Sequence, residues 1–222
     1  MKTILEKAGH ILASLKSDDV LGKYIDASYP IPQPYQGSGT IKLIILGQDP
    51  TVKNAVARAK IKTVLNLDKN GSARGYLSDL SQKLGFDLQQ NIYATNIYKN
   101  FFIAPPTQIS EIDIFKTFLT AWLPLLKDEL AQFDGVPVIT LGRPVLSSLL
   151  KSDTPNRLRD CWGYTSKWRA GQFDSLDYIK PEENLLGCTI FPFPHQPTLR
   201  KPFYRERKDR YIAFVRDNAF SK

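Results

Sequence analysis

The segment Ile41-Lys-Leu-Ile-Ile-Leu46 is followed directly by Gly47-Gln-Asp-Pro50. A nearly continuous run of branched apolar residues is typical of a β-strand that is covered on both faces. Glycine and proline both interrupt a regular β ladder, so the strand is expected to end abruptly at this point. The sequence therefore predicts a buried strand that delivers a polar turn to one edge of a sheet.

Three further segments show the same pattern of a short apolar strand followed by a polar or glycine-containing turn: Asn91–Asn96, Val136–Leu141 and Leu185–Pro192. Apolar residues recur at every third or fourth position, as in amphipathic helices, over 3–16, 75–84, 110–132, 144–151 and 203–218. Strands that alternate with helices over such long connections predict a three-layer α/β/α sandwich with a central four-stranded, mainly parallel sheet. Residues 28–39, rich in proline and glycine, are predicted to form a loop.

The composition bounds the class of protein. The chain has 222 residues, of which 42% are hydrophobic, and this suits a single domain spanning residues 1–222. No run approaches the roughly 18 apolar residues of a membrane span, and the N-terminal segment is charged throughout, so we expect neither a membrane span nor a signal peptide. We accordingly expect a cytoplasmic protein, associated with the nucleoid if the cell is prokaryotic.

Few residues of this chain are suited to metal binding. The two cysteines are Cys161 and Cys188, and the two histidines are His10 and His195. These numbers argue against a disulfide framework and against a Cys- or His-rich metal centre. His10 lies off the apolar stripe of the first predicted helix, and we expect it to be a surface residue. The formal charge of +8 favours a polyanionic partner, although solubility alone would also account for it.

Polar residues gather at the predicted strand ends, where parallel sheets bind their ligands. They are Gln48, Asp49, Asn96, Arg143 after Gly142, and His195. A carboxylate can orient a water molecule, an imidazole can donate to a developing oxyanion, and a carboxamide can pair with the edge of a planar base. The same residues also have ordinary roles in turns and helix caps. Spacing alone leaves both interpretations open.

Four segments carry a resemblance to a known family. Leu46-Gly-Gln-Asp-Pro50 resembles the GQDPYH motif of the uracil-DNA glycosylase superfamily, and His195-Gln-Pro-Thr-Leu199 resembles its HPSPL segment. Between them, Tyr93–Lys99 resembles the YITNVVK strand of the iron-sulfur branches, and Val138–Leu149 resembles the strand-glycine-helix unit before the histidine motif. The chain thus resembles a divergent member of this superfamily over about residues 41–219.

The resemblance implies a DNA glycosylase that flips uracil or a related damaged base out of DNA and hydrolyses its N-glycosidic bond in base excision repair. It implies DNA as the partner, no cofactor or metal, and a monomer. By similarity, Asp49 positions the attacking water or stabilises the sugar cation, and His195 binds the base oxygen. Gln48 and Asn96 contribute to the base pocket. Leu199 matches the residue that fills the gap left by a flipped base, with a core contact as the alternative.

Several positions depart from the family pattern. Thr51 and Val52 stand where the family has Tyr and His, so exclusion of 5-substituted bases is not implied. Leu65 aligns with the aromatic residue that stacks on the base, and losing such a face forfeits roughly 1–3 kcal/mol per base. Pro197 replaces the Ser of HPSPL, with Thr198 beside it as a substitute hydroxyl, and the iron-sulfur cysteines are absent. These departures motivate an alternative, a catalytically weak or inactive protein that binds DNA or a partner. A hydrolase unrelated to DNA would leave the basic clusters unexplained.

Two basic stretches adjoin the two motifs. The first contains Lys53, Arg58, Lys60 and Lys62, and the second contains Arg200, Lys201, Arg205, Arg207, Lys208 and Arg210. We expect phosphate contacts from Lys53, Arg200 and Lys201, and from Arg143 on the strand-end rim, while phosphate contact by the rest of the first stretch stays open. Residues 205–210 are expected to form a solvated helix face with internal ion pairs. The pattern does not place residues 152–184, which include Trp162, Lys167, Trp168 and Arg169.

Overall fold

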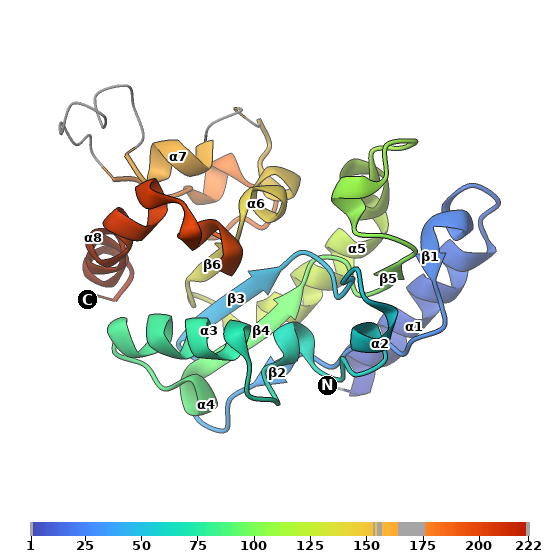
Figure 1. Ribbon diagram of the computed structural model, residues 1–222, viewed down its shortest axis with the longest axis horizontal. Helices are drawn as coiled ribbons and strands as arrows, with labels where there is room; N and C mark the ends of the chain where they lie inside the picture. Colours follow the sequence, from blue (N-terminus) through green and yellow to red (C-terminus); the bar gives the residue numbers. More distant parts are fainter. Residues whose placement is uncertain (1, 153, 155–156, 164–175, 221–222) are drawn as a thin grey trace.

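The computed structural model describes residues 2–152, 154, 157–163 and 176–220. Its main sheet has five strands in the order β2-β4-β3-β6-β7 (Figure 1). Their bounds are β2 Tyr35–Gln36, β3 Leu43–Gly47, β4 Ile92–Asn96, β6 Val138–Leu141 and β7 Ile190–Phe193. The strands β3, β4, β6 and β7 are parallel, and every residue in them is buried. The predicted α/β class with a mainly parallel sheet is therefore confirmed.

The sheet has one strand more than predicted. β2 lies in the stretch predicted to be a loop and pairs antiparallel with β4, with Tyr35 opposite Ala94 and Gln36 opposite Tyr93. Two residues are too few to show an alternating pattern, and the nearby prolines are tolerated because β2 is an edge strand. The prediction of four strands is wrong for this reason.

Helices cover both faces of the sheet. The long ones are α1 Lys2–Ser17, α3 Ser72–Lys83, α5 Ile114–Leu130, α6 Arg143–Leu149 and α8 Pro202–Ala219, each close to its predicted range. The short ones are α2 Ala55–Arg58, α4 Leu88–Asn91 and α7 Arg157–Cys161. Figure 1 shows α3 in front of β3 and β4 and α5 behind them. Leu77 and Leu80 of α3 and Phe118 and Trp122 of α5 belong to the hydrophobic core.

Smaller elements complete the chain. β1 Ile25–Asp26 and β5 Phe101–Phe102 form a separate antiparallel pair. The 3-10 turns are η1 Leu21–Tyr24, η2 Val64–Asn66, η3 Pro106–Gln108, η4 Ala131–Phe133, η6 Pro181–Glu183 and η7 Gln196–Arg200. His10 is exposed on α1, as predicted. Among the described residues, no helix combines the length and apolar character that crossing a membrane requires.

The strand order creates one special position in the sheet. After β3 the chain adds β4 on one side, and later adds β6 on the other side of β3. The chain therefore changes direction across the sheet between β3 and β6. In open α/β sheets, ligands bind outside the carboxyl ends of the strands at such a switch point.

Candidate functional site

A cavity of about 550 Å³ lies at the carboxyl ends of β3, β6 and β7. We call it the strand-end pocket. Gly47–Asp49 border it after β3, Leu141–Pro144 after β6, and Pro194 and His195 after β7. Leu65 and Thr51 complete one wall, and Tyr204 of α8 contributes to another. The pocket thus lies at the switch point of the sheet and is large enough for a planar heterocycle.

Asp49 is held in place by two hydrogen bonds. Its Oδ2 accepts from Gln48 Nε2 at 2.6 Å, and its Oδ1 accepts from the backbone N–H of Thr51 at 2.7 Å. Burial of the carboxyl raises the pKa of Asp49 to about 6, against the opposing effect of the hydrogen bonds from Thr51 and Gln48 and of the positive charge of Arg58. The side chain therefore changes its charge close to neutral pH, as a general base or acid must.

His195 follows β7 and lines the same pocket. Partial burial lowers the pKa of its imidazole, so the ring is neutral at pH 7 and carries a single N–H donor. The hydroxyl of Tyr76 on α3 donates to the carbonyl of Pro194 at 3.1 Å and fixes the residue before the histidine. The backbone that carries His195 is thereby anchored to α3, and its neutral imidazole lines the same pocket as Asp49.

Gly142 allows His195 to approach the end of β6. Its φ of +88° is in the left-handed region, and a Cβ at this position would lie 3.2 Å from the Cβ of His195. The N–H of Gly142 also donates to the carbonyl of Phe193 at 2.6 Å. A side chain at position 142 would therefore crowd His195 at the edge of the pocket.

Asn96 lies directly behind the pocket wall rather than on it. A Cβ on Gly47 would lie 2.3 Å from Asn96 Oδ1, so only glycine leaves room for this carboxamide. Asn96 is 2% exposed, and its Oδ1 has no hydrogen-bond partner among the described residues. A buried acceptor without a partner is uncommon and is often explained by a ligand or an ordered water molecule.

Leu65 is held in an unfavourable backbone conformation. Leu65 and Asn66 have φ values of +57° and +52°, which residues other than glycine rarely adopt. The side chain of Leu65 lines the pocket next to Gly47. Such backbone strain clusters at functional sites.

Cations border the pocket without carboxylate partners. Arg143 and Lys201 line it and are exposed, and no described residue forms an ion pair or side-chain hydrogen bond with either. Arg200 and Lys53 are also exposed, but neither lines the pocket. The rim of the pocket therefore presents positive charge to a ligand.

The η7 turn contains two further candidates. Thr198 lines the pocket, whereas Leu199 does not and instead packs, half-buried, against the hydrophobic core. This position corresponds to the core contact considered for Leu199, and its insertion into DNA stays a prediction.

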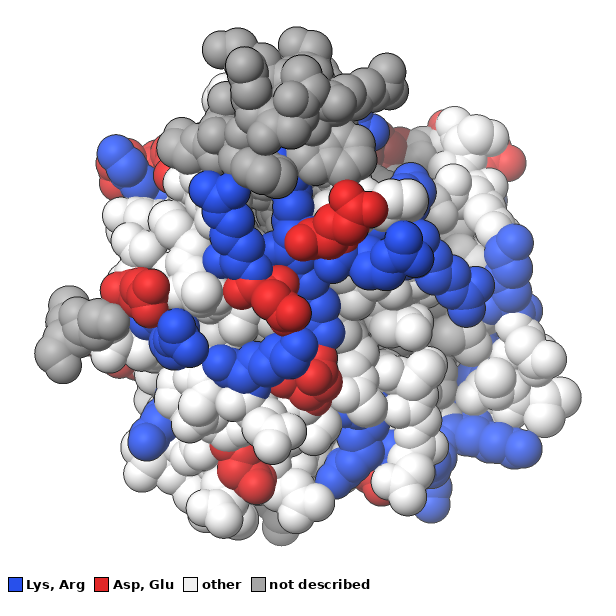
Figure 2. Space-filling view, turned by 60° about the vertical axis from the view of Figure 1, so that its left-hand side comes forward, with Lys and Arg blue, Asp and Glu red and all other residues white. Residues whose placement is uncertain are grey.

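The two basic stretches differ in what their charged side chains contact, and the question left open for Arg58 is decided. Arg58 is 6% exposed and cannot reach phosphate, because its guanidinium is enclosed by backbone carbonyls. Residues 205–210 of the second stretch lie on α8, where Arg205, Glu206, Asp209 and Arg210 are exposed and Arg207 is buried. Two ion pairs leave the helix, Lys208 with Asp79 and Asp209 with Lys83, and they join α8 to α3. Figure 2, in which the side of the molecule with α8 and α3 comes forward, shows acidic and basic side chains interleaved.

Some residues that line the pocket were not anticipated from the sequence. Thr107 belongs to η3, Arg159 to α7 and Tyr204 to α8. No local motif marks them, because their positions depend on how distant elements pack. Of the unplaced segment, Trp162 is buried, while Lys167, Trp168 and Arg169 lie outside the described residues.

The fold and the pocket together define an α/β protein with a cationic strand-end site that contains one carboxyl and one neutral imidazole. In the described part of the chain, no group of three or more His, Cys, Asp or Glu side chains is arranged to hold a metal ion. Comparison of the chain with protein-family models and with curated proteins gives no match.

Proposed function

We propose that this protein is a DNA glycosylase that removes uracil or a related damaged base. One observation carries the proposal: Asp49, whose pKa is raised to about 6, and the neutral His195 border a single pocket whose rim is cationic. Breaking an N-glycosidic bond develops positive charge on the sugar and negative charge on the departing base. A carboxylate and an N–H donor in one pocket match these two charges.

The pocket wall supports recognition of a planar base. The carboxamide of Asn96 lies behind Gly47 with an unsatisfied Oδ1, and a carboxamide can pair with the donor and acceptor edge of a base. The carboxamide of Gln48 is already engaged with Asp49, so its proposed contribution is to orient the carboxylate rather than to read the base. Thr51 and Leu65 would then border the ring of the bound base.

The cations on the rim support DNA as the partner. A base inside a duplex cannot reach a pocket of this kind, and flipping it out costs a few kcal/mol. Contacts from Arg143, Lys201 and the hydroxyl of Thr198 to the flanking phosphates would offset part of this cost. Arg200 and Lys53, both exposed, would extend the contact along the strand, and Leu199 would occupy the vacated position.

The test is release of free base from oligonucleotides that contain uracil, hypoxanthine, xanthine or a 5-substituted uracil, as single strands and as duplexes. Asp49→Asn and His195→Ala are each expected to lower the rate about 100-fold or more. Absence of base release from every substrate by the unmodified protein would overturn the proposal.

A second candidate function is DNA binding without catalysis. It is favoured by Leu65, which provides no aromatic face at the wall of the pocket, and by Thr51, whose hydroxyl accepts a hydrogen bond from the N–H of Phe102 at 2.8 Å. It predicts salt-dependent DNA binding that survives Asp49→Asn, with no abasic product. Under either function, Lys201→Glu should weaken DNA binding much more than Lys127→Glu. Lys127 is the control because it is an exposed lysine on α5 outside the strand-end pocket.

A further inference from the structure

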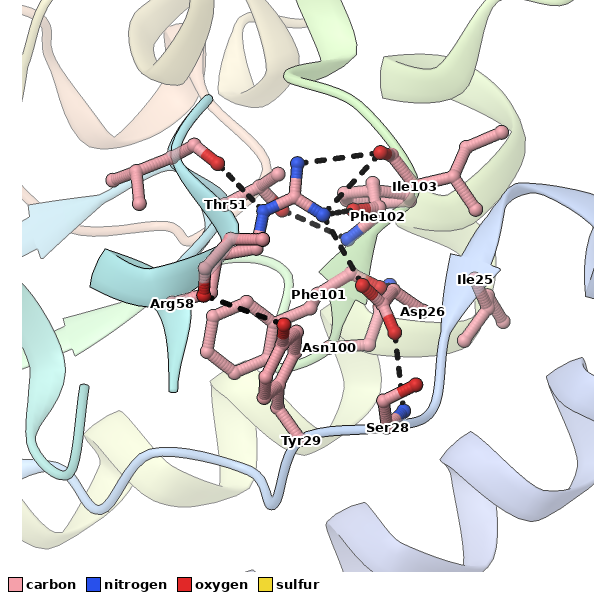
Figure 3. A network of polar contacts seen from close by, with 12 residues as sticks. Ile25, Asp26, Ser28, Tyr29, Thr51, Arg58, Asn100, Phe101, Phe102 and Ile103 are labelled. Carbon is pink, nitrogen blue, oxygen red and sulfur yellow. Dashed lines mark hydrogen bonds and ion pairs between the residues drawn. The ribbon is translucent and has the colours of Figure 1, made fainter. Parts of the chain in front are cut away.

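A buried arginine lies beneath the loop that holds Asp49. Arg58 is the last residue of α2, and its side chain is only 7% exposed. Its Nε donates to the carbonyl of Val52 at 2.6 Å, and its Nη1 donates to the carbonyl of Phe102 at 3.0 Å and to Asp26 Oδ2 at 3.1 Å. Its Nη2 donates to the carbonyl of Ile103 at 3.2 Å (Figure 3). One guanidinium thus connects the loop after β3 with β1 and with the end of β5.

The same loop fixes the Asp49 carboxyl. Thr51, the residue before Val52, donates its N–H to Asp49 Oδ1 at 2.7 Å, and its Oγ1 accepts from the N–H of Phe102 at 2.8 Å. Two adjacent residues of the loop are therefore tied to Phe102, one through the Thr51 hydroxyl and one through Arg58. Figure 3 shows Thr51, Phe102 and Arg58 gathered at this point.

The position of α2 is set independently. Asn54 caps its first turn by accepting from the N–H of Ala57 at 3.0 Å, and the hydroxyl of Tyr29 donates to the carbonyl of Ala55 at 3.4 Å. A helix of four residues has little stability of its own, so these contacts hold the backbone from which Arg58 extends. Because arginine has five donors in a rigid fork, it can bind these three carbonyls and the carboxylate at once, whereas lysine has three donors on a single nitrogen and methionine has none.

We propose that Arg58, neutralised by Asp26, is a positioning residue that holds the loop at 51–52 so that the Thr51 N–H stays on the Asp49 carboxylate. This inference rests on the proposed function, because it assigns Arg58 a part in the action of that site. Arg58 touches neither the pocket nor a substrate; it acts through Val52 and Thr51.

Release of the loop has a specific consequence for Asp49. The carboxylate would lose the Thr51 donor and the nearby charge of Arg58, both of which lower its pKa. The other ionisable groups around it, His195, Arg143 and Lys201 on the pocket and Tyr98 behind β3, stay in place. The acid limb of the pH–rate profile would therefore move to higher pH.

The experiment compares single-turnover base release by the full chain from pH 5 to 8.5 for the unmodified protein, Arg58→Met, Arg58→Lys and Asp26→Asn. The matched control is Lys99→Met, since Lys99 is also a buried cation, paired with Glu129, and has no contact with the Asp49 loop. Arg58→Met is expected to lower kcat by about 100-fold, the effect of misplacing a reacting group by about 1 Å, with KM nearly unchanged. Arg58→Lys, which keeps the charge without the fork, should fall between Arg58→Met and the unmodified protein.

The outcomes separate positioning from general destabilisation. Lys99→Met should lower the melting temperature while leaving kcat and the acid limb in place. Equal losses of kcat in Lys99→Met and Arg58→Met, or an unmoved acid limb in Arg58→Met, would overturn the inference. If Arg58→Met does not fold, Arg58→Lys decides it by the same criteria. Asp26→Asn leaves the Arg58 bond to Val52 in place, so it should change kcat and the acid limb less than either substitution of Arg58.

Failure of the proposed function would be visible separately, as absence of base release by the unmodified protein. The inference about Arg58 would then be decided by NMR titration of the Asp49 carboxyl carbon, assigned with Asp49→Asn. A higher pKa of Asp49 in Arg58→Lys than in the unmodified protein supports the positioning role, and an unchanged pKa refutes it.

Discussion

Replacing Asp49 by Asn is expected to stabilise the fold at neutral pH even though it removes the proposed catalytic carboxylate. Burial raises the pKa of this carboxyl from 3.8 to about 6 in the folded protein. The folded state therefore binds the proton more tightly than the unfolded state does, and this contribution to stability is complete below about pH 4. It is lost as the pH rises towards 6, whereas an Asn side chain does not titrate.

The size of the effect follows from the two pKa values. At about 1.4 kcal/mol per pH unit, a rise from 3.8 to about 6 corresponds to about 3 kcal/mol. The hydrogen bonds around the side chain need not be lost. The Asn oxygen can still accept from the Thr51 N–H, and Gln48 can turn its amide to accept from the new NH2 group. At 2–4 °C per kcal/mol for a chain of this size, the melting temperature at pH 8 should rise by about 6–12 °C.

Urea and thermal unfolding of both proteins at several pH values from 4 to 8 measure this difference. The matched control is Asp87→Asn, because Asp87 caps α4 by accepting from the N–H groups of Gln89 and Gln90 at 2.6 and 3.1 Å. Asn is an equally good cap, so this change should alter stability by less than about 0.5 kcal/mol. A stability difference for Asp49→Asn that is the same at pH 4 and pH 8, or a loss of stability at pH 8, would refute the reasoning.

Substitutions of Gly47 and Gly142 by alanine test the pocket wall, with Gly75→Ala as the control. Gly47→Ala would place a Cβ 2.3 Å from Asn96 Oδ1, and we expect a loss of about 1–3 kcal/mol in urea unfolding together with loss of base release. Gly142→Ala combines a φ of +88° with a Cβ 3.2 Å from His195; a destabilisation of about 1–3 kcal/mol and an altered imidazole NMR titration are expected. Gly75→Ala, on α3, adds a Cβ that meets no atom within 4 Å beyond the adjacent residues and helix backbone. It should instead stabilise by about 0.5–1 kcal/mol, and equal behaviour of all three variants would contradict the steric argument.

The fold was predictable because its strands are buried on both faces. In β3 every residue is buried, which favours the continuous apolar run that is visible in the sequence. The edge strand β2 was not predictable, since backbone pairing of Tyr35 and Gln36 with β4 requires no particular side chains. Whether Tyr35 and Gln36 form a strand depends on the free backbone groups of β4 beside them, and these are not visible in the local sequence.

The site was predictable to the extent that strand ends carry it. Asp49, Arg143 and His195 follow β3, β6 and β7 directly, so locating the strands located them. The role of Arg58 could not be found in this way. Its partners Asp26 and Phe102 lie 32 and 44 residues away in the chain, and a basic residue in a basic stretch gives no local sign that it is buried.

Several energetic costs converge on the strand-end pocket. In the described part of the chain, two side-chain oxygens are buried without a hydrogen-bond partner: Oδ1 of Asn96, the last residue of β4, and Oγ1 of Thr140, which precedes the pocket residue Leu141 in β6. Each such group costs about 1–3 kcal/mol. The strained backbone at Leu65 adds about 1–3 kcal/mol, and ionisation of the buried Asp49 adds to this at neutral pH. A chain under selection for stability alone would lose these features one substitution at a time. Their concentration around one cavity is the pattern expected where binding or catalysis maintains them. This argument does not depend on the identity of the ligand.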